Sequence, residues 1–402
     1  MWIPPWSRVA FTLFTVGWGA NQFSPLILVY RQHGIAETTV TAAFAAYALG
    51  LMPTLLLAVP LAGPLSRPRL LRAALVLSGA SSATLLTVGD RGALLIAGRL
   101  LSGIASGAAF SPGTEWIADL SPSARPGTAA RRAAVSLTAG FGGGPLIAGL
   151  IGQFSSAPEV VPYAAHLCLV SAALVCGRRV PEPNPRSGGR PRSRSGTWRA
   201  VFRQPFFVRE VIWTAPLVFA AATTSFAVLP SLVPPARLAV AAGGAMAGLT
   251  LGAGLAAQMI SARFAVCNSS GTRLIGLTGA AVGFAVGAVA VARHVYGLVP
   301  VAGVLFGAAY GLLLVSGLTD IEARAERPAL APTVAVFYCL TYLGFVAPYA
   351  VILLAKVMAP SVCFLGAAGL TVLLTLVTVF AHRRIPVAAR CGIVEPVGRG
   401  PE

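Results

Sequence analysis

The sequence predicts an all-α membrane protein with twelve transmembrane helices arranged in two pseudo-symmetric six-helix bundles. Three observations carry this prediction. The 402-residue chain is 56% hydrophobic and only 10% charged, whereas about a quarter of the residues in soluble domains are charged. The charges gather between long apolar runs, each near the length of about 20 residues that crosses a bilayer. An arginine- and proline-rich stretch near the middle divides these runs into two sets of six.

Twelve apolar runs are expected to be membrane-spanning helices, and the sixth is short. They cover residues 9–30, 40–62, 69–89, 92–118, 133–154, 160–177, 208–233, 238–261, 274–292, 295–318, 332–355 and 357–380. The first run is too long for the core of a signal peptide and has no clean cleavage pattern. We therefore expect it to be retained as a helix.

The positive residues behind the formal net charge of +18 are distributed in a way that indicates the membrane topology. With the N-terminus inside, the cytoplasmic segments hold 24 of the 30 Lys and Arg residues, and the outer loops hold five. This bias toward the inside predicts a plasma-membrane protein with both termini in the cytoplasm. It also argues against nucleic acid as a partner and leaves the lipid bilayer as the surface that the positive charge meets.

Residues 178–207 are predicted to be a cytoplasmic linker. They are rich in Arg, Pro, Ser and Gly, with Glu182 as the only acid before the next run, and such a composition cannot bury a core. The linker separates an N-terminal bundle, residues 1–177, from a C-terminal bundle, residues 208–381. Residues 382–402 form a predicted cytoplasmic tail.

The two halves show a weak internal repeat with an offset of 203 to 205 residues. The matched pairs are Ala97-Gly98 with Ala302-Gly303, Gly103 with Gly307, Gly107 with Gly311, Gly140 with Gly344, and Pro145 with Pro348. A parallel repeat with glycine- and proline-interrupted helices in equivalent places is typical of transporters. It predicts a substrate site near the membrane midplane, between the halves.

Four segments resemble signatures of the major facilitator superfamily. Gly140-Phe-Gly-Gly-Gly-Pro-Leu-Ile-Ala-Gly149 is similar to the fifth-helix signature of its exporters, G-x-x-x-G-P-x-x-G-G, and departs from it at Ala148. The other segments are Leu95–Gly103, similar to the fourth-helix signature; Asp119–Arg125, similar to the end of that helix; and Gly63–Arg72, a reduced G-x-L-x-D-R-x-G-R-R loop without the aspartate and second glycine. The resemblance implies a secondary transporter of the drug:proton antiporter branch, driven by a proton gradient and without a cofactor.

Arg99 is the clearest candidate for function, because a guanidinium inside a span usually faces a cavity or a partner. Asn21 and Gln22 lie near the middle of the first run. In the fold that the resemblance implies, the first and fourth helices both line the cavity. We therefore hypothesise a polar cluster of Arg99, Asn21 and Gln22 that acts in substrate binding or coupling. The alternative is that Arg99 reaches the outer interface or bonds backbone carbonyls.

No Asp or Glu lies near the middle of a predicted span, so a proton carrier has to be sought at the span ends. Glu115 is the candidate proton carrier, and Glu210, at the start of the seventh run, is a further acid near a span end. Asp119, about one turn beyond Glu115, is expected to pair with Arg67, Arg69 or Arg72 and hold the inward gate closed. The alternative for Asp119 is an ordinary helix-end charge in water.

Candidate conformational residues are glycines and a proline, because bare glycine faces let membrane helices approach closely. They are Gly63 in the loop between runs two and three, and Gly140, Gly144, Pro145 and Gly149 in the fifth run. We expect the Gly140–Gly149 segment to bend or slide against a neighbour, such as a helix of the other half.

Tyr338 and Tyr342 recur at helical spacing in the eleventh run and are candidates for stacking on a flat substrate. The alternative is ordinary core packing. A cavity with aromatic and small residues suits a neutral or cationic lipophilic compound.

Other functional classes lack their signatures. The four histidines and six cysteines are dispersed without metal-ligand spacing or a CxxC pair, and there is no phosphate-binding loop or set of catalytic residues. The sequence therefore predicts a monomeric transporter of a small molecule, without enzyme activity or a metal, that works by alternating access. Proton-coupled export is the preferred interpretation, and an importer or facilitator of a small metabolite is the open alternative.

Overall fold

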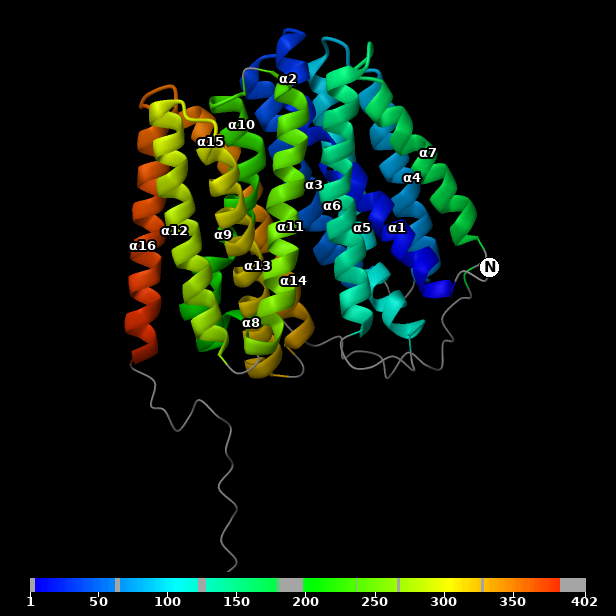
Figure 1. Ribbon diagram of the computed structural model, residues 1–402. Coiled ribbons are helices and arrows are strands. Elements are labelled where there is room, and N and C mark those ends of the chain that lie inside the picture. The colour runs from blue at the N-terminus through cyan, green and yellow to red at the C-terminus, as the bar shows by residue number, and fades with distance from the viewer. Residues whose placement is uncertain are drawn as a thin grey trace, which may run out of the picture.

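The computed structural model describes residues 4–61, 66–121, 128–178, 180, 198–235, 237–265, 268–326 and 329–383, and this part of the chain contains helices and turns without a strand. Figure 1 shows the helices running roughly side by side. The lower end of the bundle is the end at which the first helix begins and the last helix ends; the opposite end is the upper end.

The described residues of the first half form seven helices. They are α1 (Pro5–Asn21), α2 (Phe23–Gln32), α3 (Glu37–Leu61), α4 (Arg67–Leu86), α5 (Gly92–Asp119), α6 (Thr128–Phe154) and α7 (Val161–Gly177). The first predicted span, residues 9–30, is divided at Gln22, because α1 ends at Asn21 and α2 starts at Phe23. Pro25 has no backbone N–H for the carbonyl four residues earlier, which weakens the helix at this point.

The second half begins with the short α8 (Trp198–Phe202). Two of its membrane-spanning segments change helix type along their length. One is η1 (Phe207–Val211, π), α9 (Ile212–Thr223), η2 (Thr224–Val228, π) and α10 (Leu229–Leu232); the other is α14 (Leu330–Tyr342), η3 (Leu343–Val346, 3₁₀) and α15 (Ala347–Leu354). The remaining helices are α11 (Ala239–Ala265), α12 (Ser269–Arg293), α13 (Leu298–Arg324) and α16 (Pro360–Arg383).

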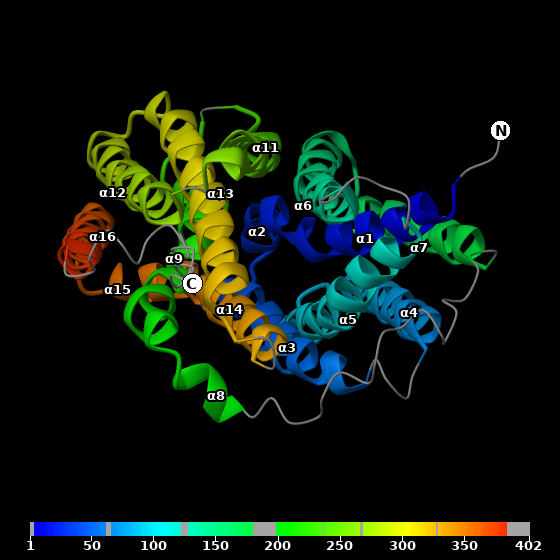
Figure 2. The same cartoon turned by 90° about the horizontal axis from the view of Figure 1, so that it is seen from below.

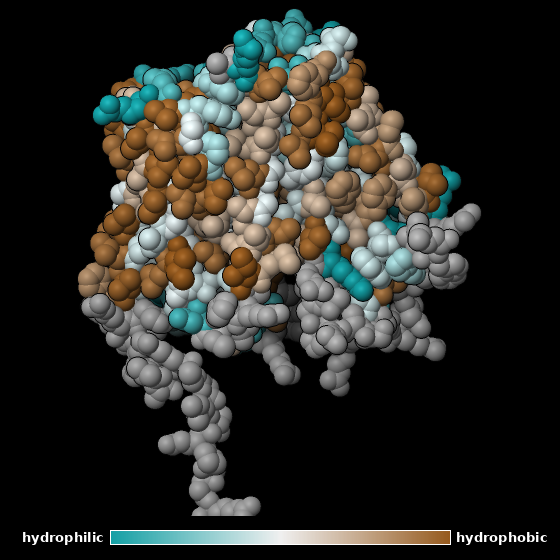
Figure 3. Space-filling model, in the orientation of Figure 1, coloured by the Kyte–Doolittle hydropathy of each residue, from teal (hydrophilic) through white to brown (hydrophobic). Residues whose placement is uncertain are grey.

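The helices account for the twelve predicted runs. Ten segments of the described chain are long and apolar enough to cross a membrane, and α7 is a shorter apolar helix of 17 residues. The broken pair α1 and α2 supplies the remaining run. Hydrophobic side chains cover much of the lateral surface in Figure 3, as expected for a surface in contact with lipid. On α16, Leu365, Leu373 and Phe380 each expose more than half of their area.

The helices form two bundles, which Figure 2 shows side by side. In the first, α5 packs between α3 and α4, and α1 packs on α6; in the second, α13 packs between α11 and α12, and α12 also contacts α16. The bundles meet where α6 and α2 contact α11, and where α3 contacts α14 and α15. Of the predicted linker and tail, residues 179, 181–197 and 384–402 lie outside the described residues.

Equivalent glycines make equivalent contacts in the two bundles, as the repeat predicts. Gly103 of α5 lies against the Tyr47 carbonyl of α3, and Gly307 of α13 lies against the Thr250 carbonyl of α11. A Cβ at either glycine would collide with that carbonyl oxygen. In the same way, Gly140 of α6 presses on the backbone of α1, and Gly344 of η3 presses on the backbone of α9. Both bundles therefore depend on the close helix approach that glycine permits.

Candidate functional site

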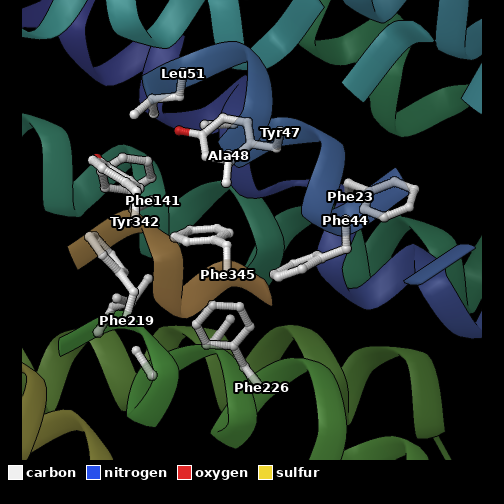
Figure 4. Packing of buried hydrophobic residues seen from close by; sticks show 14 of the residues in the cluster. Phe23, Phe44, Tyr47, Ala48, Leu51, Phe141, Phe219, Phe226, Tyr342 and Phe345 are labelled. Carbon is white, nitrogen blue, oxygen red and sulfur yellow. The ribbon is translucent and has the colours of Figure 1, made fainter. Parts of the chain in front are cut away.

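A layer of buried aromatic rings joins the two bundles at the centre. This aromatic layer consists of Phe44, Tyr47, Phe219, Phe226, Tyr342 and Phe345. The Phe345 ring centroid lies 5.4 Å from that of Phe44, 5.2 Å from that of Tyr47 and 5.1 Å from that of Phe219. Figure 4 shows Phe345 with Tyr47 of α3 above it, Phe44 of α3 beside it, and Phe219 of α9 and Phe226 of η2 below it. The layer therefore links the two halves through Phe345 of η3 and through the contact of Phe44 with Phe226, whose ring centroids are 6.5 Å apart.

Arg99 of α5 lies beside this layer and is fully buried. Its guanidinium carbon is 4.8 Å from the ring centroids of Phe23 and Tyr47 and 6.0 Å from that of Phe44. This geometry allows cation–π attraction, which is strongest where the cation is desolvated. One Nη donates a hydrogen bond of 2.7 Å to the Ala20 carbonyl, whereas Nε and the other Nη have no partner among the described residues.

The hypothesis that Arg99 contacts the side-chain amides of Asn21 and Gln22 is wrong. Among the described residues, Arg99 bonds the backbone of Ala20 rather than either amide. The helix break explains this contact, because the end of α1 presents carbonyls that α5 can reach: Ser102 also donates to the Gly19 carbonyl at 3.4 Å. The alternative that Arg99 reaches the outer interface is excluded by its complete burial.

Asn21 compensates for a proline in another helix. Pro145 of α6 cannot donate to the Phe141 carbonyl, and the Asn21 Nδ2 donates to that carbonyl at 3.3 Å. The same device recurs in the second half. Pro348 cannot donate to the Gly344 carbonyl, which accepts from the Ala347 N–H instead and also from the Thr223 hydroxyl at 3.2 Å. Neighbouring helices thus supply the donors that proline removes inside an apolar environment.

Gln22, at the break itself, is buried and faces away from Arg99 toward α4. Its Nε2 donates to the Ser82 hydroxyl at 3.2 Å, and that hydroxyl lies 2.7 Å from the Nδ1 of His166. The amide oxygens of Gln22 and Asn21 are both buried without a partner in the described part of the chain. Such orphaned acceptors are rare in folded proteins and mark a place where a ligand, a water or a rearrangement can supply a donor.

The two tyrosine candidates have different surroundings. Tyr342 belongs to the aromatic layer and stacks on Phe219 at 4.6 Å between ring centroids. Tyr338 is half-buried, with its ring centroid 6.0 Å from that of Phe337. Of these two residues, only Tyr342 belongs to the layer beside Arg99.

At the lower end of the first bundle, Arg67 joins α4 to α5. It forms ion pairs with Asp119 and, at 3.1 Å, with Glu115. The expected pair of Asp119 with an arginine of this loop is therefore present, while Arg69 and Arg72 are exposed. Glu115 and Asp119 each expose 33% of their side chains. Gly63 lies outside the described residues.

A second and more deeply buried ion-pair cluster occupies the lower end of the second bundle. Arg273 of α12 pairs with Asp320 of α13 and, at 3.1 Å, with Glu210 of η1. Arg324 pairs with Glu210 at 2.9 Å and with Asp320 at 3.4 Å. The Arg273 and Asp320 side chains are only 2% and 5% exposed. Charges buried this deeply are tolerated only when they are paired.

The predicted glycine segment of α6 contacts a helix of the other half. Gly149 lies against the backbone of Val240 and Gly244 in α11, and Gly142 lies near Gly248. Gly140 and Gly144 face α1 instead, at Phe14 and Trp18. The segment thus lies between one helix of its own bundle and one of the other. Pro145 is inside α6, which continues through it.

A protein-family model described as the Major Facilitator Superfamily matches residues 9–267. The chain belongs to the major facilitator superfamily. This assigns it to a family of transporters and accounts for the two bundles of six helices.

Solved structures agree with this major facilitator fold. The chain is similar to the crystal structure of the nucleoside transporter NupG, with a TM-score of 0.71 and 13% identity over 96% of this chain and 100% of that one. The D323A mutant of NupG gives a TM-score of 0.72 and 12% identity, over 94% and 98% of the two chains. At this identity the likeness shows the fold alone. No curated protein matches the chain.

The sequence interpretation of this major facilitator protein missed several residues. Phe345, His166 and Ser82 gave no signal, because an isolated ring, imidazole or hydroxyl in an apolar run is read as core. The second ion-pair cluster did have a signal. Arg273 follows Arg67 by 206 positions and Asp320 follows Glu115 by 205, close to the offset of the repeat.

Proposed function

We propose that this transporter works by alternating access and carries a small planar organic solute, neutral or anionic, at the centre between its bundles. The observation that carries the proposal is the position of Arg99. A fully buried guanidinium with unpartnered N–H groups lies beside a layer of aromatic rings that spans both halves. Aromatic rings with a few polar groups are the usual lining of a small-molecule site.

The charge at this centre supports the choice of solute. No carboxylate contacts Arg99 in the described ranges, so its charge is balanced only by ring faces and carbonyl dipoles. An incoming cation would be repelled, whereas an anion or a hydrogen-bond acceptor would satisfy the free N–H groups. Of the neutral or cationic lipophilic compound that the sequence favoured, this proposal keeps the neutral alternative and departs from the cationic one.

The contacts between the bundles support a state closed at the upper end. Near that end, the Gln153 Oε1 of α6 accepts a hydrogen bond of 3.1 Å from the Val240 N–H of α11. Deeper in, Phe44 meets Phe226 and Phe345. The ion-pair clusters at the lower end each lie within one bundle, so they do not need to break when the bundles separate there. The arginine excess supports placing this lower end in the cytoplasm of a plasma membrane.

The direction that we propose is proton-coupled export, supported by the glycine–proline segment of α6 and its contact with α11. Uptake is the second candidate. It is favoured by the unpartnered amide oxygens of Asn21 and Gln22, which suit a solute with hydrogen-bond donors. NupG, a nucleoside transporter of the same fold, makes a nucleoside-like solute the first uptake probe.

Proteoliposomes with the purified full chain test this proposal. Three labelled probes are compared under an imposed proton gradient of either sign: uridine as a neutral planar solute, salicylate as a planar anion and tetraphenylphosphonium as a lipophilic cation. We expect transport of a neutral or anionic probe that Arg99→Met abolishes. Transport of the cation alone, unchanged in Arg99→Met, would contradict the proposal. The sign of the gradient that drives accumulation distinguishes export from uptake.

A further inference from the structure

His166 is a buried histidine in the second turn of α7, with zero exposed area. Both of its ring nitrogens have partners on other helices. The Nε2 lies 3.0 Å from the Thr15 carbonyl of α1, and the Nδ1 lies 2.7 Å from the Ser82 hydroxyl of α4. One imidazole therefore bridges three helices of the first bundle.

The partners determine the protonation state of the ring. A carbonyl can only accept a hydrogen bond, so the Nε2 carries the hydrogen that is donated to Thr15. In the neutral ring the Nδ1 is then an acceptor for the Ser82 hydroxyl. Gly19 makes room for this arrangement, because a Cβ there would lie 2.6 Å from the ring Cε1. The site thus holds a neutral imidazole whose Nδ1 can take a proton once the Ser82 hydroxyl turns its hydrogen to another acceptor.

The hydrogen-bonded chain continues to the break in the first span. The Ser82 hydroxyl accepts from the Gln22 Nε2, and Gln22 is the residue between α1 and α2. The other end of its amide, Oε1, is buried without a partner in the described structure. An amide that turned over would present this oxygen to Ser82 in place of the nitrogen.

We propose that His166 is the proton-binding site of the transporter and that Ser82 and Gln22 transmit its protonation to the break between α1 and α2. A proton taken from water on one side of the membrane adds to Nδ1, which becomes a donor to Ser82. The Ser82 hydroxyl then donates to the turned Gln22 Oε1. Release of the proton to water on the other side restores the original order of donors.

This inference rests on the proposed alternating access, because the break lies beside the centre between the bundles. Ala20, two residues before Gln22, accepts the hydrogen bond from Arg99. A change at Gln22 therefore acts on the backbone that holds the candidate solute-binding residue. Proton binding and solute binding would then both act on the same backbone segment, from Ala20 to Gln22, as coupling requires.

The charged groups around the ring are compatible with this role. On the helices packed against α7, they are Arg8 of α1, Arg67, Arg69 and Arg72 of α4, and Arg131 and Arg132 of α6, all near the lower end. On α7 itself the titratable groups are Tyr163, Cys168 and Cys176; Tyr163 bonds Tyr30 of α2 at 3.1 Å. Arg99 of α5 is the charge buried at the centre.

Glu115, the carrier expected from the sequence, is engaged differently. It is paired with Arg67 at the lower end and is one-third exposed. His166 lies closer to the break and is linked to it by hydrogen bonds.

Pulsed electron-spin distance measurements test the proposal without a known solute. Spin labels are placed at Ala73 of α4 and Ala323 of α13, two exposed positions near the lower end, in the cysteine-free full chain in lipid nanodiscs. Between about pH 4 and about pH 8, a range wide enough to include protonation of a buried imidazole, we expect the ratio of two distance populations to change about tenfold. His166→Gln, which keeps hydrogen-bonding groups but cannot titrate, should give one ratio at both pH values.

Two further variants complete the test. Ser82→Ala keeps the imidazole but removes its link to Gln22, and it should also lose the pH response. His294→Asn alters an exposed histidine at the upper end and should keep it. The assignment would be overturned if His166→Gln kept the full pH response. It would also be overturned if Glu115→Gln lost the pH response while His166→Gln and Ser82→Ala kept it.

Two distance populations whose ratio does not change with pH in the labelled protein that keeps His166 would overturn the proton site and leave alternating access intact. A single fixed distance under every condition, with and without the three solute probes, would overturn both.

Discussion

Arg99 donates a hydrogen bond of 2.7 Å to the backbone carbonyl of Ala20, at the end of α1 where the first span breaks. The contact ties a buried cation on α5 to the helix end that also carries Asn21 and Gln22. The unpaired N–H groups of Arg99 remain beside the aromatic layer. The same residue thus stabilises the break and supplies the charge at the centre.

Arg99→Lys should lower solute transport by about tenfold or more. An ammonium keeps the charge but lacks the planar fork that bonds a carbonyl and lies over two rings at once. Transport of the responsive probe in proteoliposomes measures the effect, with Arg91→Lys in the exposed upper loop as the matched control. Wild-type transport in Arg99→Lys would remove this side chain from the mechanism.

Asn21→Ala should destabilise the protein by about 1–3 kcal/mol, because it leaves the buried Phe141 carbonyl without a donor. Pro145→Ala restores a backbone N–H to that carbonyl, so the double variant should lose less than the sum of the two single losses. Unfolding by denaturant in detergent measures all four proteins. Strict additivity would show that Asn21 does not compensate for Pro145.

Asp320→Asn should cost more stability than Asp119→Asn. Asp320 is 5% exposed, and removal of its charge leaves Arg273 and Arg324 to share the single carboxylate of Glu210, a loss of about 3–5 kcal/mol. Asp119 is 33% exposed, and its pair with Arg67 is worth about 0–1 kcal/mol. Thermal unfolding of the two variants in detergent makes the comparison. Equal losses would mean that burial does not distinguish the two clusters.

Gly103→Ala and Gly307→Ala should each destabilise their bundle by about 1–3 kcal/mol, because the added methyl group meets a carbonyl of the facing helix. Gly366→Ala is the control. A Cβ at Gly366 of α16 has no neighbour within 4 Å, so the substitution should be neutral or slightly stabilising. Parallel losses at 103 and 307 in unfolding assays would support the repeat. A loss at only one of them would contradict it.

The sequence predicted the architecture because the relevant signals are local. Run length sets the spans, the placement of arginine sets the loops, and the match between Gly103 and Gly307 relates the halves. The break at Gln22 was missed, since Pro25 lies within an otherwise apolar run and proline is tolerated in membrane helices. The π-helical turns of η1 and η2 also leave no pattern in the sequence.

The candidate site was predictable only where a residue is costly in lipid. Arg99 was identified because a guanidinium inside a span is costly and usually has a functional role. Its partner was not, since the choice between the Asn21 amide and the Ala20 carbonyl depends on how α5 meets α1. His166 shows the same limit. Its role depends on hydrogen bonds to Thr15 and Ser82 that only the packing of three helices brings together.

The most direct test of alternating access is a pair of distances measured in the same protein. Spin labels at Ala73 and Ala323 report on the lower end, and labels at Asp90 and Val295, exposed near the upper turns, report on the upper end. The account predicts opposite changes: conditions that lengthen the lower distance shorten the upper one. Two distances that stay fixed, or that lengthen together, would contradict it.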